Sequence, residues 1–420
     1  MRIKDLPKHV GERVKVRGWV FRRRELKDKV FLVLRDSTGI VQCVVPSSLK
    51  GVEKARIESS VIVSGSLKKD ERAPGGHEIA VEKLKVVGEA EVFPITKDQS
   101  VEFLLDVRHL WLRSRKLTAI MKVKDTALRA AREWFHKHGF WEVTPPIIVS
   151  GACEGGATLF KFKYFDRTAF LSQSAQLYLE ALIYSLEKVY SLTPSFRAEK
   201  SRTRRHLAEY WHLEGEAAWV DHEENMRIQE QLVSYMVKKV VKERKEELES
   251  LGRDVKILKR VKPPFKRMTY DKAIEILQRR GMEIEWGEDL GADEERELTK
   301  DLRKPIFLTN YPRKIKAFYM KVDPRDENKV LNDDLLSPEG YGELIGGSQR
   351  EDDLEKLKEN MKLFKLRPKD YEWYLDLRRY GSVPHSGFGL GMERFVMWVC
   401  RLDHIRDTIP FPRVINRAYP

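Results

Sequence analysis

Short runs of alternating apolar and polar residues dominate the first ninety positions of the chain. They occupy residues 14–20, 30–34, 40–45, 60–64 and 78–87 and are rich in β-branched side chains. Alternation with a period of two is typical of strands that are buried on one face, and residues 36–39 and 73–76 supply turns between them. The pattern therefore predicts five short strands, which favours a small closed β-barrel.

The strand pattern lapses near residue 93, and beyond residue 115 the apolar residues recur at helical spacing. Residues 127–137 have this period and lead to Gly139, a residue type that often ends helices. A second long helix is expected at residues 223–249. Because 420 residues are too many for one ordinary core, we expect a further, larger domain to follow the barrel.

Composition and charge indicate the cellular compartment and the type of binding partner. The chain has 79 Lys and Arg against 65 Asp and Glu, and its net charge of +14 favours a polyanionic partner, although charge also simply keeps proteins in solution. The three cysteines match no zinc or disulfide spacing, so a reducing cytoplasm is expected. No apolar run approaches the roughly 20 residues of a membrane span, and no membrane partner is expected.

Two segments place arginines beside carboxylates or glycines. One begins Ser195-Phe-Arg-Ala-Glu199 and ends at Glu214, and the other is Gly387-Phe-Gly-Leu-Gly-Met-Glu-Arg394. A permanently charged guanidinium next to such groups suits a bent polyphosphate. The glycine run is not followed by Gly-Lys-Ser/Thr, so it is no Walker loop. Together these segments resemble motifs 2 and 3 of class II aminoacyl-tRNA synthetases, and residues 139–146 resemble motif 1.

The resemblance implies an α+β protein with two domains. Residues 1–92 would form an OB-fold barrel that binds the anticodon, and residues 93–115 would form a linker or hinge. Residues 116–420 would form the class II catalytic domain, built on an antiparallel β-sheet flanked by helices. It also implies ATP and Mg²⁺ at the active site, tRNA as the partner, and a homodimer formed through the motif 1 region.

Motif 2 implies most of the nucleotide-binding residues. Arg197 would neutralise the α-phosphate and the substrate carboxylate as they approach, and Glu199 would accept a hydrogen bond from the adenine amino group. Arg205 and His206 would hold the terminal phosphates, and Tyr210 would offer its ring to adenine. The substrate carboxylate is itself the nucleophile, so catalysis requires positioning and charge stabilisation and no general base.

Motif 3 and the carboxylates that precede it complete the nucleotide site. Arg394 would stack over the purine and pair with the γ-phosphate. Asp334 and Glu343 match the family's metal ligands, and Mg²⁺ is a hard ion that binds carboxylate and phosphate oxygens. The spacing of these two carboxylates differs from that of the aspartyl enzymes, which leaves Asp333 as an alternative to Asp334.

The predicted amino-acid site resembles that of the subclass specific for aspartate, asparagine and lysine. Glu154 lies in a segment similar to the mobile loop of that subclass, whose glutamate meets the α-ammonium group. Ser174 and Gln176 lie in a segment similar to its substrate-binding strand and helix, with Gln176 near the same amine. Arg350 stands where the subclass reads a side-chain carbonyl or carboxylate, which disfavours lysine.

Two positions favour asparagine over aspartate. The aspartyl enzymes have a lysine where this chain has Leu179, and a charged substrate would lack that counter-ion in a dry pocket. Glu214 can accept from an amide NH₂ and would repel a second carboxylate. We therefore expect asparagine and tRNA-Asn as substrates. The alternatives are an aspartyl enzyme, including one that charges two tRNAs, a synthetase-like asparagine synthetase, and a non-catalytic RNA-binding relative.

Aromatic and basic residues alternate within the predicted barrel, as in surfaces that stack bases and bind phosphates. Phe31 and Gln42 match the pair that, in this subclass, stacks on and hydrogen-bonds the central uridine of the anticodon. Arg22 and Arg23 belong to a neighbouring basic run. The resemblance implies that Phe31 and Gln42 bind the anticodon, and the basic run predicts that Arg22 and Arg23 bind its phosphates.

Overall fold

The computed structural model of the protein describes residues 1–151, 159–200 and 203–420. It divides into two compact units, Met1–Leu104 and Leu105–Pro420. The boundary between them falls inside the segment 93–115 that was expected to be a linker. This segment also contains two short helices, α1 (Val101–Asp106) and α2 (Arg108–Trp111).

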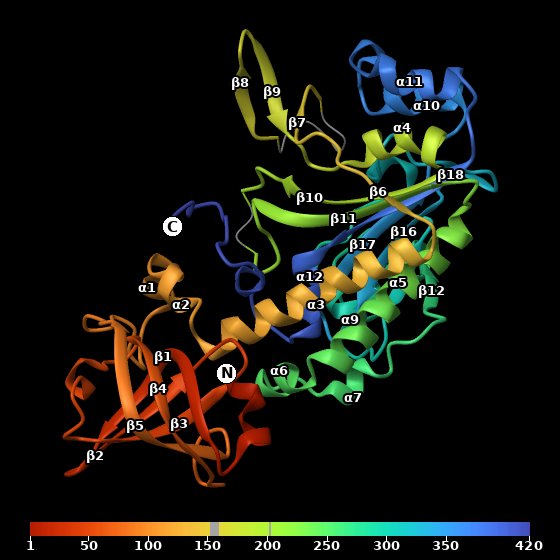
Figure 1. Ribbon diagram of the computed structural model, residues 1–420. Helices are drawn as coiled ribbons and strands as arrows, with labels where there is room; N and C mark the ends of the chain where they lie inside the picture. The colour runs from red at the N-terminus through yellow and green to blue at the C-terminus, as the bar shows by residue number, and fades with distance from the viewer. Residues whose placement is uncertain (152–158, 201–202) are drawn as a thin grey trace. The chain divides into compact units, whose positions relative to one another are not determined.

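The first unit is a five-stranded closed barrel with strand order β1–β2–β3–β5–β4 (Figure 1). Its strands are β1 (Arg13–Glu25), β2 (Lys29–Arg35), β3 (Ile40–Pro46), β4 (Ser60–Lys69) and β5 (His77–Gly88). Val14, Val16 and Val20 of β1 point into the core and alternate with exposed residues. The predicted five-stranded barrel is confirmed. The prediction succeeded because local alternation is enough to specify a strand with one buried face.

The second unit is built on an eight-stranded sheet with order β12–β13–β16–β17–β18–β11–β10–β6. Its strands are β6 (Trp141–Glu142), β10 (Lys188–Phe196), β11 (Glu209–Ala218), β12 (Lys266–Thr269), β13 (Ile306–Thr309), β16 (Asn332–Ser337), β17 (Gly342–Gln349) and β18 (His385–Gly391). Neighbours are antiparallel except for β10 with β6 and β12 with β13, at the two ends. The predicted α+β class with an antiparallel catalytic sheet is confirmed.

The two faces of this sheet differ in chemistry. Leu213 and Ala217 of β11 join the main apolar core, whereas His212, Glu214 and Glu216 alternate with them and belong to the opposite, polar face. Several helices contribute to the core on the apolar face, among them α3 (Arg115–Lys137), α5 (His222–Glu243) and α12 (Met392–Val399) (Figure 1). The polar face is therefore the one left for ligands.

Helix ends follow recognisable sequence signals. Ser114 caps α3 by accepting a hydrogen bond from the amide of Leu117, and Gly139 follows the helix with a φ of +78°. The single helix expected at 223–249 is instead two helices, α5 and α6 (Lys245–Ser250), because the backbone leaves the helical region at Arg244.

Smaller elements complete the second unit. They are β7 (Ile148–Val149), β8 (Lys161–Tyr164), β9 (Arg167–Leu171), α4 (Gln176–Leu186), α7 (Val255–Leu258), α8 (Tyr270–Arg279), α9 (Ala292–Thr299), β14 (Val322–Asp323), β15 (Asp326–Val330), α10 (Leu354–Leu363) and α11 (Glu372–Arg379). Helix α4 contacts β10 and β11. Within the described residues, no helix has both the length and the apolar character needed to cross a membrane.

A buried ion pair connects three elements of the second unit. The Lys124 ammonium of α3 donates to Glu393 of α12, and the side chains are only 8% and 1% exposed. The other Glu393 oxygen accepts from the backbone amide of Trp211 on β11 at 2.9 Å. Glu393 is adjacent to Arg394, so this pair holds the start of α12 against the sheet.

We expect Lys124→Met to lower the free energy of unfolding of this unit by about 3–5 kcal/mol, because a buried carboxylate is left without its cation. The matched control is Lys122→Met on the same helix. Lys122 lies 3.5 Å from Glu247 and is 31% exposed, so the control should cost about 1 kcal/mol or less. Urea unfolding of the full chain, followed by tryptophan fluorescence, measures both. Equal effects of the two variants would contradict the role given to the buried pair.

Candidate active site

A cavity of about 410 Å³ opens on the polar face of the eight-stranded sheet. A smaller pocket adjoins it and shares Arg197, His212, Glu343 and Gly389 with it. Most of the residues predicted for the site line one or both of these hollows: Ser174, Gln176, Leu179, Arg197, Arg205, His206, Tyr210, Glu214, Asp334, Glu343, Arg350 and Arg394. The structure thus brings together residues that lie up to 220 positions apart in the chain (174 to 394).

Glycines of β18 make room for this cavity. A Cβ atom on Gly389 would overlap the ring of His212, and one on Gly387 would overlap the carboxylate of Glu216. Both glycines face β11 across the ladder, where Gly389 pairs with Glu214 and Gly387 with Glu216. Larger side chains at these positions would displace the polar groups of β11. The glycine run is therefore needed for close packing beside the cavity.

Arg197, His206 and Tyr210 of motif 2 line the smaller pocket, whereas Glu199 lies beside Arg197 and His206 without lining it. The backbone amide of Arg197 donates to Ala208 at 3.0 Å, which fixes the residue at the end of β10. Its guanidinium carbon lies 5.7 Å from the ring centre of Tyr210, and one of its nitrogens lies 3.8 Å from Glu199. His206 lies 3.6 Å from the other oxygen of Glu199. Burial and then the charge of Arg394 lower the pKa of His206.

The other two arginines of this region are held by carboxylates. Arg394 donates to Glu343 Oε2 at 2.6 Å. Arg205 donates to Glu295 Oε2 at 2.8 Å and to the backbone oxygen of Glu343 at 3.2 Å. Glu343 thus contacts both guanidinium groups. Two cations and their counter-ions form one connected cluster beside the cavity.

The two predicted metal ligands face each other. A Cβ atom placed on Gly346 would lie 3.4 Å from Glu343 Oε1 and 3.8 Å from Asp334 Oδ1. Burial and the neighbouring charge of Glu343 raise the pKa of Asp334 to about 6, against the lowering effect of Lys316. Burial would raise the pKa of Glu343, but the charge and hydrogen bond of Arg394, together with the charges of Lys316 and Arg197, outweigh it and lower the pKa to about 2. Paired carboxylate oxygens of this kind fit a hard divalent cation such as Mg²⁺.

Asp333 cannot replace Asp334 as a ligand in this cavity. Adjacent residues of a strand point to opposite faces, and Asp333 is directed toward α5, where Gln229 donates to it at 2.6 Å. Its side chain is fully buried there. The alternative left open by the sequence is therefore wrong, for a reason that strand geometry supplies.

At the other end of the cavity, Glu214 is held in place by the start of the segment that leads to α4. Its two oxygens accept hydrogen bonds from the Ser174 hydroxyl and from the Ala175 amide, the latter at 2.9 Å. Burial raises the pKa of Glu214, and the two hydrogen bonds oppose that effect. Ser174 Oγ also accepts a hydrogen bond from the backbone amide of Gln176 at 3.1 Å. These contacts fix the carboxylate relative to the first turn of α4.

Arg350 extends its guanidinium into the same end of the cavity. Glu216 accepts from its Nε at 3.0 Å and from its Nη2 at 2.9 Å, and Ser348 accepts from its Nη1 at 2.7 Å. Leu179 lines the cavity and is fully buried, since it also packs with Ile183 in a small apolar cluster behind it. This end of the cavity thus contains one arginine, two glutamates and an apolar wall.

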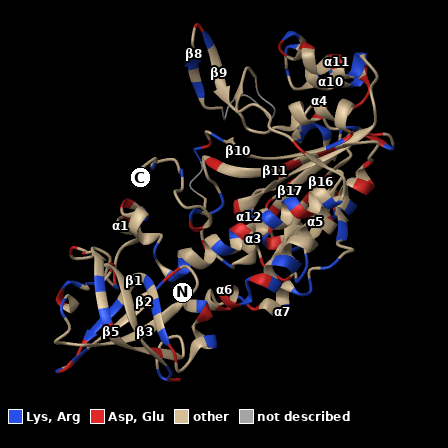
Figure 2. Cartoon of the chain, in the orientation of Figure 1, with Lys and Arg blue, Asp and Glu red and all other residues tan. Residues whose placement is uncertain are grey.

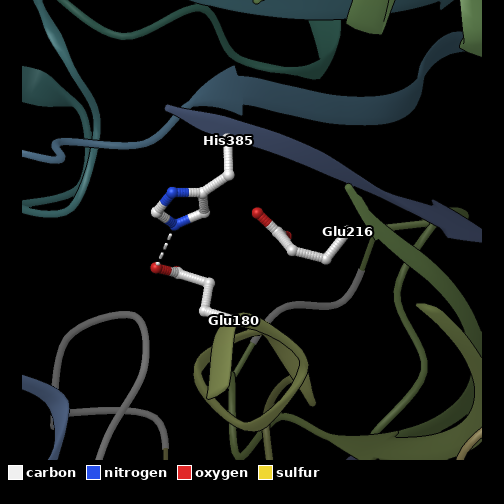
Figure 3. Close-up of side chains that lie close together, drawn as sticks. All are labelled: Glu180, Glu216 and His385. Carbon is white, nitrogen blue, oxygen red and sulfur yellow. Dashed lines mark hydrogen bonds and ion pairs between the residues drawn. The ribbon is translucent and has the colours of Figure 1, made fainter. Parts of the chain in front are cut away.

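A second group of potential metal ligands lies behind Arg350. Among the described residues, Glu180, Glu216 and His385 place one ligand atom each within 4.8 Å of one another (Figure 3). Their charges are already balanced, because Arg350 pairs with Glu216 and Arg378 donates to Glu180 at 2.8 Å. A metal ion would have to displace two buried guanidinium groups. We therefore interpret this group as an internal ion-pair network.

The predicted anticodon residues lie on neighbouring strands of the barrel. Arg22 pairs with Val33 and Val33 with Gln42, and Phe31 lies one step along the same outer face. Gln42 donates to Glu78 at 2.9 Å, which orients its amide. Arg23 points the other way and donates to the backbone oxygens of Val52 and Ala55. The structure thus brings Arg22, Phe31 and Gln42 together and separates Arg23 from them.

Several residues of the cavity were not identified from the sequence. Lys316 donates to Asp334 at 2.9 Å and lies 3.6 Å from Asp289. Lys316, Asp289 and Glu295 all come from a segment for which the sequence suggested no role. In a chain with 79 Lys and Arg, no local pattern distinguishes such a lysine. The predicted amine-binding Glu154 lies outside the described residues.

Comparison with known proteins agrees with this geometry. Residues 100–415 match the family model for tRNA synthetases class II (D, K and N), and residues 14–87 match an OB-fold nucleic acid binding domain. The asparagine–tRNA ligase of Thermococcus kodakarensis is 61% identical over 420 residues, which is 99% of this chain and 97% of the relative.

Solved structures give the same result. The asparaginyl-tRNA synthetase of Pyrococcus horikoshii complexed with asparaginyl-adenylate superposes with a TM-score of 0.96 at 59% identity, covering 99% of this chain and 98% of its own. The Entamoeba histolytica enzyme with the same adenylate reaches 0.90 at 35% identity, covering 98% and 97%. The chain therefore belongs to the class II tRNA synthetases of the aspartate, lysine and asparagine group, and within it to the asparagine–tRNA ligases.

Proposed function

We propose that the protein activates asparagine with ATP to form asparaginyl-adenylate and then transfers the asparaginyl group to tRNA-Asn. The observation that carries this proposal is the amide-compatible end of the cavity, where Leu179 and Glu214 lie beside Arg350, an arginine already paired with Glu216. The solved relatives in complex with asparaginyl-adenylate support the same reaction.

In the first step, the carboxylate of asparagine attacks the α-phosphorus of ATP, and pyrophosphate leaves as the bond between the α- and β-phosphates breaks. Arg197 neutralises the two approaching anions, and Arg394 compensates the charge of the terminal phosphates. Glu199 accepts from the adenine amino group, and Tyr210 supports the purine ring. Arg205 adds positive charge for the phosphates at the border of the same pocket, and His206 lies beside it as a hydrogen-bonding side chain.

Asp334 and Glu343 would hold Mg²⁺, which supplies positive charge to the phosphates when it is bound. Lys316 donates a hydrogen bond to Asp334, so this chain also supplies a cation of its own beside the proposed metal site. In the second step, the terminal ribose hydroxyl of the tRNA attacks the asparaginyl carbonyl and AMP leaves. Positioning by this chain's own residues carries both steps.

Asparagine is selected by the charge of its pocket. Arg350 has nitrogen donors toward the cavity and can donate to the side-chain carbonyl of asparagine. Glu214 can accept from the side-chain NH₂, directly or through a water. Aspartate would bring a second carboxylate near Glu214, while Glu216 already neutralises Arg350. The apolar Leu179 offers no replacement cation, so aspartate would bind poorly or take up a proton.

The barrel would bind the anticodon of tRNA-Asn. Basic side chains are frequent along β1 (Figure 2), and Phe31 and Gln42 lie on the adjoining strands. A half-buried aromatic ring beside an oriented amide suits stacking on one base and hydrogen bonding to its edge. Arg22 shares that outer face, whereas the role proposed for Arg23 is weakened by its two backbone partners.

We also propose a homodimer formed through the motif 1 region. Strand β6 is the edge of the eight-stranded sheet, and its Trp141 is 61% exposed. An unpaired edge with a large exposed aromatic side chain suits burial against a second copy. The tRNA substrate places the protein in the cytoplasm, where tRNA is charged.

Arg394→Ala should abolish adenylate formation while leaving tRNA binding nearly intact. Loss of a phosphate cation should reduce the rate by about a thousandfold, which corresponds to roughly 4 kcal/mol of transition-state stabilisation. The readouts are asparagine-dependent ATP–pyrophosphate exchange and tRNA binding. Arg401→Ala, at an exposed arginine just beyond α12, is the matched control. Exchange at the wild-type rate in Arg394→Ala would refute the assignment of this residue.

Leu179→Lys, alone and combined with Glu214→Gln, should raise the aspartate-to-asparagine ratio of kcat/KM, and the double variant should raise it more. A lysine restores a cation for a β-carboxylate, and the Glu214→Gln change removes a repelling charge. Leu179→Met is the neutral control for altered packing. Exchange assays with both amino acids measure the ratio, which should move without full inversion. If the correctly folded variants keep the wild-type aspartate-to-asparagine ratio of kcat/KM, the charge argument for asparagine fails and the aspartyl enzyme becomes the better interpretation.

Gln42→Ala should weaken discrimination at the central base of the anticodon by about 1–3 kcal/mol. Arg22 is a neighbour of Gln42 on the same face. Arg22→Ala should instead weaken the binding of all tRNAs alike and flatten the salt dependence of binding. Charging of transcripts that carry each base at the central position separates the two effects. If Gln42→Ala keeps the wild-type base preference, this glutamine does not read the base.

A further inference from the structure

A fully buried carboxylate lies directly behind the residue predicted to bind the substrate amine. Gln176 and Glu180 are four residues apart on α4, so their side chains lie on the same side of the helix. The Gln176 Nε2 donates to Glu180 Oε1 at 3.0 Å. Gln176 lines the cavity, whereas Glu180 has no exposed surface. Glu180 therefore acts on any ligand only through another residue.

Other donors also converge on Glu180. Its Oε2 accepts from Arg378 at 2.8 Å and lies 2.9 Å from His385 Nε2 (Figure 3). The Tyr374 hydroxyl lies within hydrogen-bond distance of both oxygens, 2.7 Å from Oε2 and 2.9 Å from Oε1. Burial alone would raise the pKa of Glu180, but the charge of Arg378 and the contact with His385 hold it well below the usual range. Glu180 is therefore ionised and can only accept hydrogen bonds.

An acceptor at this position determines how the Gln176 amide is oriented. Only the NH₂ group of an amide can donate to a carboxylate, so the opposite orientation would set two oxygens against each other. Gln176 Oε1 is then the amide atom that remains for a ligand. Among the residues that the structure describes, none donates a hydrogen bond to it. An oxygen in the cavity wall suits a cationic donor such as an α-ammonium group.

We infer that Glu180 is a positioning residue for recognition of the α-ammonium group of the amino-acid substrate. It fixes the Gln176 amide so that the carbonyl oxygen, and not the NH₂, meets the ammonium. The inference rests on the proposed function, because it takes asparagine as the occupant of the cavity. Glu180 also connects the residue that would bind the α-ammonium group, Gln176, with the residue that would bind the side chain, Arg350. The connection runs through Arg378 and His385, which belong to the network behind Arg350.

Glu180→Gln tests this role, because a neutral amide can donate as well as accept and no longer fixes the Gln176 amide. Binding of asparagine, of ATP and of succinamate to the full-length protein is measured by calorimetry. Succinamate retains the carboxylate and carboxamide of asparagine but lacks the α-amine. We expect the Kd for asparagine to rise about tenfold, which is the scale of one hydrogen bond to a charged group. The Kd values for succinamate and ATP should stay unchanged.

Two further variants keep the test decisive. Tyr374→Phe removes the hydroxyl that contacts both Glu180 oxygens but leaves the carboxylate and its hydrogen bond from Gln176, so asparagine should bind as in the wild type. Glu180→Gln combined with Arg378→Met removes the buried arginine that the single variant leaves unpaired, and it serves if the single variant does not fold.

Two results would overturn the inference: an unchanged Kd for asparagine, or equal losses for asparagine and succinamate, which would mean that Glu180 only supports the fold. If the wild-type protein itself does not bind asparagine, the proposed function fails instead.

Discussion

The polar face of the catalytic sheet depends on pairing its arginines with carboxylates. A buried charge without a partner costs several kcal/mol, so each guanidinium here is held by a glutamate. The pairs are Arg205 with Glu295, Arg350 with Glu216, Arg378 with Glu180 and Arg394 with Glu343. Each pair joins residues far apart in the chain, and together they fix the strands and helices around the cavity.

These pairs divide the cavity into two ends with different electrostatics. At the nucleotide end, Arg205 and Arg394 share Glu343 and stand beside Lys316, so several cations are grouped where a polyanion would bind. At the amino-acid end, Glu216 neutralises Arg350 in a bidentate contact and Glu214 adds a carboxylate. The first end is suited to phosphates and the second to a neutral amide. This division is the physical basis of the proposed specificity.

Local sequence patterns predicted elements well because the relevant interactions are local. Alternation specified the barrel strands, and the segments around Arg197 and Arg394 identified the nucleotide end. Adjacent residues of a strand face opposite sides, so the same rule could have excluded Asp333 as a ligand.

Long-range contacts were not predictable in this way. Glu295 lies 90 positions from its partner Arg205, and nothing near either residue indicates the pairing. The role of Arg23 in the barrel was hidden for a different reason. The register between β1 and β2 shifts between Val20 and Arg22, and a bulge of this kind changes which side chains face outward. The backbone oxygens that Arg23 binds belong to a turn that sequence reasoning did not place.

The central claim is that an amino-acid pocket whose arginine, Arg350, is already paired with Glu216 commits this enzyme to asparagine. The most direct measurement is ATP-dependent attachment of labelled asparagine and labelled aspartate to purified tRNA-Asn and tRNA-Asp, in all four combinations. The account predicts that only asparagine with tRNA-Asn gives substantial charging. Charging of either tRNA with aspartate at a comparable rate would contradict it.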